Sequence, residues 1–156
     1  MSLINEELKN LIADKNSLKI VSNQNREGLI NSAPKGSLEL SGDDEITYVE
    51  ILESSSSYRN TVYSIWFDKE VSVLVVGEQK ETYLIQTKVK KILTCGTEFE
   101  EYYRKYKELR GFDIAGVVKL TVEKVKNLNL AKLIELQKEE HPFFSHYDSR
   151  AIESNE

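Results

Sequence analysis

The sequence has little of several residue types on which whole classes of protein depend. Its single cysteine, Cys95, excludes an intrachain disulfide and indicates a reducing, cytoplasmic environment. No apolar run approaches the length that crosses a membrane, and the N-terminus lacks the apolar core of a signal peptide. The net charge of −5 lacks the basic surplus that a nucleic acid or an acidic membrane requires. We therefore expect a soluble cytoplasmic protein with neither of those partners.

Side chains that carry catalysis are equally scarce. The two histidines, His141 and His146, lie near Asp148 but without a second cluster of ligands, so we expect no metal site. No serine stands in a nucleophile context, and the sequence has no glycine-rich phosphate loop. We therefore expect no catalytic side chains, and a bound cofactor would have to supply any reactive centre.

What is present suits one compact domain with a buried core, since 40% of the 156 residues are hydrophobic and 30% are charged. Strand patterns are found at residues 18–21, 29–33, 37–40, 46–52, 71–76, 82–93 and 114–125, and helical spacing at residues 4–12, 58–66, 97–110 and 130–136. Short turns join most of the strands, which favours an antiparallel sheet of six or seven strands that closes into a barrel. We expect a mainly β domain with flanking helices over residues 1–128, followed by a C-terminal helix and tail over residues 129–156.

Three local patterns lead to more detailed expectations. The nearly continuous apolar run Val71–Val76 predicts a strand buried on both faces. Residues 58–66 carry one apolar stripe that ends at Trp66, as in a helix packed against a core or an interface. Thr97 and Glu100 have the spacing of a capping box at the start of the next helix.

Two segments have the features of a cofactor site. In Asn31–Ser37 a proline breaks a strand and leaves backbone groups unpaired, a glycine allows close approach, and Lys35 adds a positive charge. In Ser57–Thr61, at a helix start, hydroxyls, free backbone donors and Arg59 converge on one point suited to a phosphate. An edge-strand bulge and an ordinary helix cap also explain these segments singly. Their presence together in one small barrel favours a ligand.

The order of these features resembles the FMN-binding split-barrel family, which includes the pyridoxamine 5′-phosphate oxidase-like proteins. The resemblance is carried by Leu29–Leu38, the next strand, the serine-bearing helix, Val71–Val76, and the long strand that leads into Gly96–Glu100. It covers roughly residues 5–125. It implies a six-stranded split barrel that forms a homodimer, with FMN in a groove between the subunits.

The resemblance also assigns the site residues by position. Pro34, Lys35, Gly36 and Ser37 would line the flavin ring and ribityl chain, Val49, Glu50 and Ile51 would flank it, and Ser57, Arg59, Asn60 and Thr61 would hold the phosphate. The sequence departs from the family pattern at Asn60, where relatives usually have a lysine or arginine, and at Thr87, where a glycine is common.

The implied function is that of a flavin-dependent oxidoreductase or electron-transfer protein. Two alternatives remain open: a module that binds another ligand, such as haem with His141 or His146 as its axial ligand, and a cofactor-free interaction protein. The aromatic side chains of the tail, Phe143, Phe144 and Tyr147, predict that the tail docks on its own barrel or on the partner subunit.

Overall fold

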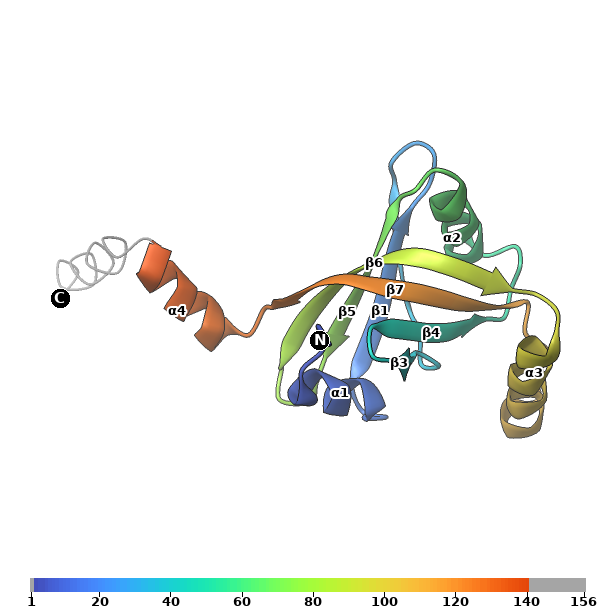
Figure 1. The fold of residues 1–156 in the computed structure, drawn as a ribbon, viewed down its shortest axis with the longest axis horizontal. Helices are drawn as coiled ribbons and strands as arrows, with labels where there is room; N and C mark the ends of the chain where they lie inside the picture. The colour runs from blue at the N-terminus through green and yellow to red at the C-terminus, as the bar shows by residue number, and fades with distance from the viewer. Residues whose placement is uncertain (1, 141–156) are drawn as a thin grey trace, which may run out of the picture.

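The structure, a computed structural model, describes residues 2–140 of the chain. The predicted tail residues His141, Phe143, Phe144, His146 and Tyr147 lie outside this range. Seven strands and four helices follow one another along the described chain (Figure 1). They are α1 (Glu6–Ala13), β1 (Leu18–Gln24), β2 (Ile30–Pro34), β3 (Glu39–Gly42), β4 (Glu45–Glu50), α2 (Ser56–Trp66), β5 (Glu70–Val76), β6 (Thr82–Leu93), α3 (Thr97–Arg110), β7 (Gly116–Asn127) and α4 (Leu130–Glu140).

All seven strands belong to one antiparallel sheet with the order β2-β1-β5-β6-β7-β4-β3. The two edge strands, β2 and β3, are consecutive in the chain. The steps from Pro34 to Glu39 span at most roughly 19 Å at 3.8 Å per residue. The sheet must therefore curl until its two edges approach each other, which confirms the predicted barrel. Pro34 ends an edge strand, where a residue without an N–H disturbs the ladder least.

The barrel interior is filled by alternate residues of the strands, and α1 packs against this core (Figure 1). The helix α1 contributes Leu8, Leu11 and Ile12, all of which are buried. On β5, Val71, Val73 and Val75 are fully buried, whereas the residues between them are half-buried. The prediction that this strand is buried on both faces was therefore wrong, because an antiparallel sheet keeps one face towards the core and the other nearer to solvent.

The helix α2 packs on the sheet with its polar face, whereas its sequence suggests that the apolar face would be buried. Its buried residues are polar: Ser57, Asn60, Thr61 and Ser64. The end of the apolar stripe faces outward instead, and the side chain of Trp66 is 79% exposed. Trp66 is therefore not part of the barrel core.

The C-terminal helix α4 extends away from the barrel (Figure 1). Each of its residues is exposed. Its position is fixed at its base, where the Asn129 side chain accepts a hydrogen bond from the Thr82 backbone N–H at 2.7 Å. Among the helices of residues 2–140, none combines the length and the apolar character needed to cross a membrane.

The helix α3 is held to the sheet by an apolar cluster and by a buried lysine. Tyr106 packs with Val49, Ile114 and Val117. Lys119 on β7, only 7% exposed, pairs with Glu98 in the first turn of α3 and with Glu45 on β4 at 3.3 Å. The helix begins without the predicted capping box, because Gly96 is the N-cap and no side chain caps the first turn. That prediction was wrong.

Glu45 should make the stability of the barrel sensitive to acid. Hydrogen bonds from Lys90 and from other donors outweigh the effect of burial and lower the pKa of Glu45 from 4.5 to about 2. A carboxyl group with a lowered pKa stabilises the fold above its unfolded-state pKa, and this contribution is lost as the pH falls towards 2. Since Glu45 is partly exposed, we expect Glu45→Gln to lower the free energy of unfolding at neutral pH by about 1 kcal/mol.

Urea unfolding of both proteins between neutral pH and about pH 2 measures this difference. It should shrink as the solution becomes more acidic. Glu101→Gln, at an exposed position of α3, serves as the matched control. A wild-type advantage that stays constant down to pH 2 would contradict the role assigned to Glu45.

Candidate functional site

A pocket of about 380 Å³ lies where the β2–β3 turn, the end of β4 and the start of α2 meet. Its apolar lining comes from Ala33, Val49, Ile51 and Leu52, and its polar lining includes Asn31, Lys35, Glu50, Ser55, Ser56 and Ser57. Tyr106 and Arg110, from the second half of α3, complete the lining. The pocket thus has apolar walls, hydroxyl groups at a helix start, and charged groups of both signs, and its volume is within the range of small-molecule sites.

The turn between β2 and β3 is fastened to both neighbouring strands. The Lys35 N–H donates to the Lys19 carbonyl oxygen on β1 at 2.8 Å. The Ser37 hydroxyl accepts from the Val49 N–H on β4 at 3.0 Å. Between them, a Cβ atom placed on Gly36 would meet no heavy atom within 4 Å, so this backbone faces open space. The turn therefore presents a fixed backbone that a ligand can approach.

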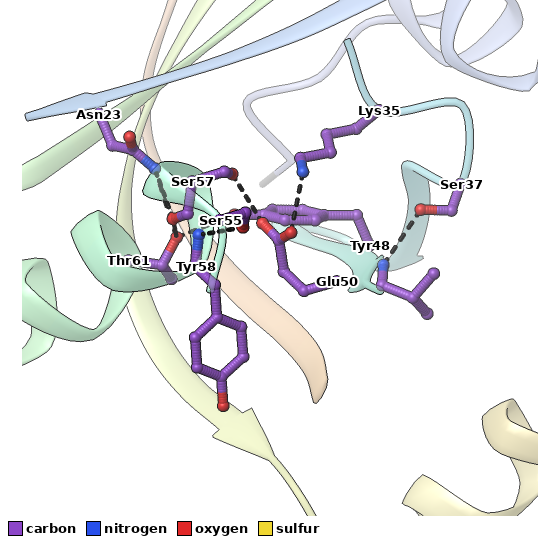
Figure 2. Close-up of polar contacts among 10 residues, drawn as sticks. Asn23, Lys35, Ser37, Tyr48, Glu50, Ser55, Ser57, Tyr58 and Thr61 are labelled. Carbon is purple, nitrogen blue, oxygen red and sulfur yellow. Dashed lines mark hydrogen bonds and ion pairs between the residues drawn. The ribbon is translucent and has the colours of Figure 1, made fainter. Parts of the chain in front are cut away.

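A buried ion pair joins this turn to β4 and α2 (Figure 2). The Lys35 Nζ atom lies 2.9 Å from Glu50 Oε2, and their side chains are 13% and 3% exposed. The other carboxylate oxygen, Oε1, accepts a hydrogen bond of 2.7 Å from the Ser57 hydroxyl. Charge-assisted hydrogen bonds to both oxygens compensate Glu50 for the water that it loses on burial.

The start of α2 is held by hydrogen bonds on its buried side. Ser55 caps the helix by accepting from the Tyr58 N–H at 3.0 Å. Asn23 on β1 donates to the Ser57 carbonyl oxygen at 3.2 Å and approaches the Thr61 hydroxyl at 3.3 Å (Figure 2). These contacts fix Ser57 at the edge of the pocket.

Tyr48 lies behind the ion pair (Figure 2). Its ring centre is 5.8 Å from Lys35 Nζ, which is a cation–π contact. Burial raises the pKa of the Tyr48 hydroxyl; the hydrogen bond with Thr61 opposes this and the negative charge of Glu50 adds to it. Tyr48 is therefore a neutral side chain at physiological pH, and it leaves the charge of this region to Lys35 and Glu50.

The overall structure is similar to several crystal structures at low sequence identity. HupZ of Group A Streptococcus is 23% identical, with a TM-score of 0.68 over 81% of this chain and 95% of HupZ. A Lactobacillus delbrueckii protein provisionally assigned as a pyridoxamine 5′-phosphate oxidase is 20% identical, with a TM-score of 0.63 over 81% of this chain and 95% of its own. An FMN-binding protein of Syntrophomonas wolfei is 17% identical, with a TM-score of 0.63 over 78% of this chain and 84% of its own.

The chain has the FMN-binding split-barrel fold. This confirms the fold that the sequence resemblance implied. No protein-family model and no curated protein sequence matches the chain. The comparisons therefore establish the architecture of this split barrel, and its chemistry has to be argued from its own residues.

The split barrel brings most of the predicted ring-side residues together in the pocket. Those that line it are Lys35, Gly36, Ser37, Val49, Glu50 and Ile51. Pro34 ends β2 next to this turn without being part of the lining. Two segments predicted to act together thus meet at one site.

The residues assigned to the phosphate are divided in the split barrel. Ser57 lines the pocket, and Thr61 is fully buried beneath it. Arg59 and Asn60 line a different pocket of about 700 Å³, on the side of α2 that carries Trp66 and Phe67. A single subunit therefore presents Ser57 and Arg59 to two separate cavities.

Seven residues that line the pocket are not among the assigned site residues: Asn31, Ala33, Leu52, Ser55, Ser56, Tyr106 and Arg110. The first five lie within or beside the segments that the sequence singled out, whereas Tyr106 and Arg110 lie on α3. Helical spacing predicts a helix over residues 97–110, but nothing local indicates that it reaches the β2–β3 turn. Burial raises the pKa of Tyr106 and the Glu39 carboxylate raises it further, so this side chain is also neutral. Arg110, in the last turn of α3, gives the pocket its second cation beside Lys35.

The hydrogen bond from Ser57 to Glu50 should contribute measurably to stability. Ser57→Ala would leave one oxygen of a buried carboxylate with fewer donors, and we expect a loss of about 1–3 kcal/mol in the free energy of unfolding. Ser56→Ala, at an exposed neighbouring position, is the matched control and should change stability by less than about 0.5 kcal/mol. Urea denaturation measures the free energy of unfolding of both variants. Equal losses in the two would contradict a stabilising role of the hydrogen bond from Ser57 to the buried Glu50 carboxylate.

Proposed function

We propose that this split barrel is an FMN-binding flavoprotein of the pyridoxamine 5′-phosphate oxidase-like kind. It would act as a flavin-dependent oxidoreductase or electron-transfer protein in the cytoplasm. The observation that carries the proposal is the pocket itself, where the β2–β3 turn, β4 and the start of α2 converge. The fold also supports it, since one protein of similar structure is described as FMN-binding.

The donor set of the pocket fits a flavin nucleotide. Ala33, Val49, Ile51 and Leu52 offer apolar surface to a planar ring, and the open backbone at Gly36 allows it to come close. Ser55, Ser56 and Ser57, at the start of the 11-residue helix α2, offer hydroxyls and the positive end of the helix dipole to a phosphate. Arg110 would add a guanidinium, which suits phosphate recognition.

A bound flavin supplies hydride or electron transfer. The chain's own part is to hold the ring between the turn and β4, to direct backbone donors of residues 35–37 towards it, and to exclude water with the apolar wall. No side chain of the pocket is required as an acid or a base. The substrate or redox partner would approach the side of the flavin ring that the chain leaves open.

We also propose that two copies of the chain form the flavin site, as in the family that the sequence resembles. Exposed apolar side chains support this arrangement: Ile51 and Leu52 of the pocket lining, and Leu109 and Phe112, which lie close to Arg110 in the sequence, are each at least 42% exposed. Large apolar side chains gathered on one surface favour a protein partner. A second subunit placed there would cover the open side of the pocket.

The first test is the absorbance spectrum of the purified protein, followed by titration with FMN and with riboflavin. If the pocket holds FMN as proposed, Arg110→Ala weakens FMN binding on the order of tenfold, because a charge-assisted contact is lost. Riboflavin, which lacks the phosphate, should bind both proteins with similar affinity.

Arg59→Ala is the decisive comparison, since the family resemblance assigns the phosphate to Arg59 and the present proposal assigns it to Arg110. If Arg59→Ala weakens FMN binding more than Arg110→Ala does, the phosphate binds in the second pocket, which Arg59 lines. Colourless protein that takes up neither flavin would refute the proposed function and favour a cofactor-free interaction protein.

The oligomeric state gives a separate prediction. Light scattering should give the mass of a dimer for the wild-type chain, and Leu52→Glu should shift it towards the monomer, because a charge would be buried against the second subunit. Trp66→Glu, at a more exposed position on α2, should leave the dimer intact. If Trp66→Glu alone dissociates the dimer, the subunits meet at α2, and a wild-type monomer would refute the proposed arrangement.

A further inference from the structure

The pocket has less free positive charge than its two cations suggest, because it also contains an acid. Among the described residues that line it, Glu50 is the only acid, and Lys35 and Arg110 are the only cations. The ion pair of 2.9 Å uses the charge of Lys35 to neutralise Glu50. A phosphate monoester carries about −1.5 to −2 at neutral pH. The lysine nearest the turn is thus already engaged by an internal anion.

Several contacts hold the Glu50 side chain and backbone in place. Both carboxylate oxygens have a donor, Lys35 Nζ at 2.9 Å and the Ser57 hydroxyl at 2.7 Å. The Glu50 carbonyl oxygen accepts from the Ala115 N–H at 2.7 Å, which fixes the end of β4. In a region of low polarizability, the field of such a fixed charge reaches a bound ligand with little screening.

We propose that Glu50 is a specificity-determining residue of the flavin pocket: held by Lys35 and Ser57, its carboxylate limits how much further negative charge the pocket accepts. This inference deepens the proposed function and rests on it. Glu50 and Lys35 act on an anionic ligand with opposite signs. Removal of the carboxylate frees the charge of Lys35 for the ligand, and removal of the lysine leaves the charge of Glu50 uncompensated.

The opposing signs separate this role from a purely structural one. If the ion pair served only to fasten the turn to β4, loss of either partner would loosen the pocket and weaken every ligand. A role in charge selection instead requires that the two substitutions move the affinity for an anionic ligand in opposite directions. It also requires that a neutral ligand of the same shape responds little.

The test uses the near-isosteric variants Glu50→Gln and Lys35→Met, with FMN as the anionic probe and riboflavin as the neutral one. We expect Glu50→Gln to bind FMN on the order of tenfold more tightly and Lys35→Met on the order of tenfold more weakly. The ratio of the FMN and riboflavin dissociation constants should shift by the same factors. The double variant Lys35→Met/Glu50→Gln restores neutrality and should return this ratio to near the wild-type value.

A surface ion pair provides matched controls. Lys88 Nζ lies 3.0 Å from Asp68 Oδ1, and neither residue lines the pocket. Lys88→Met and Asp68→Asn make the same changes of charge at this distant pair and should leave both dissociation constants within about twofold of wild type, because exposed charges are screened. Urea unfolding of each variant establishes that it is folded.

Each outcome decides between the two proposals. If wild-type protein binds FMN, and Glu50→Gln and Lys35→Met shift the FMN affinity in opposite directions, the proposed function and the role of Glu50 are both supported. If wild-type protein binds no flavin but Glu50→Gln does, the role of Glu50 stands and the proposed function falls. If wild-type protein binds FMN and the two variants both weaken it or leave it unchanged, the role of Glu50 is refuted and the function is retained. If no variant binds either flavin, both proposals are refuted.

Discussion

The link between β2 and β3 joins the two edges of one sheet with four residues, 35–38. Because so short a segment cannot cross an open seven-stranded sheet, the strands have to curl until the edges meet. The pocket lies at this junction, with Lys35 and Ser37 on the link and Glu50 at the end of β4. The ion pair of Lys35 and Glu50 is therefore a consequence of barrel closure, since residues 15 apart in sequence are brought within 2.9 Å.

The closure also explains why a charged pair can be stable inside a small barrel. Ser57 reaches Glu50 from α2, so three separate segments contribute to one carboxylate. Removing one partner of a buried ion pair lowers the free energy of unfolding, because the charge of the other partner is left uncompensated. The position of the turn, the end of β4 and the start of α2 thus depend on one another.

Much of this architecture could be predicted from the sequence, because strand alternation, turn residues and helical spacing are local signals. The sequence patterns place every strand and helix of the described residues within a few residues of its observed bounds. The chemistry of Pro34 and Gly36 also indicates the turn that lines the pocket. The facing of α2 could not be predicted in this way. Helical spacing identifies an amphipathic helix, but which side lies on the sheet depends on distant partners, here Asn23 and Tyr48. The same limit applies to Arg110, which reaches the pocket only because α3 packs against β7.

The helix α2 belongs to two surfaces at once. Its polar side is bonded to the barrel at Ser57 and Thr61, and its last turn carries Trp66 at the outer surface. Eleven residues of helix form a rigid rod of about 16 Å. One end of this rod thus lies at the outer surface, and the other end carries Ser57, whose hydroxyl donates to Glu50.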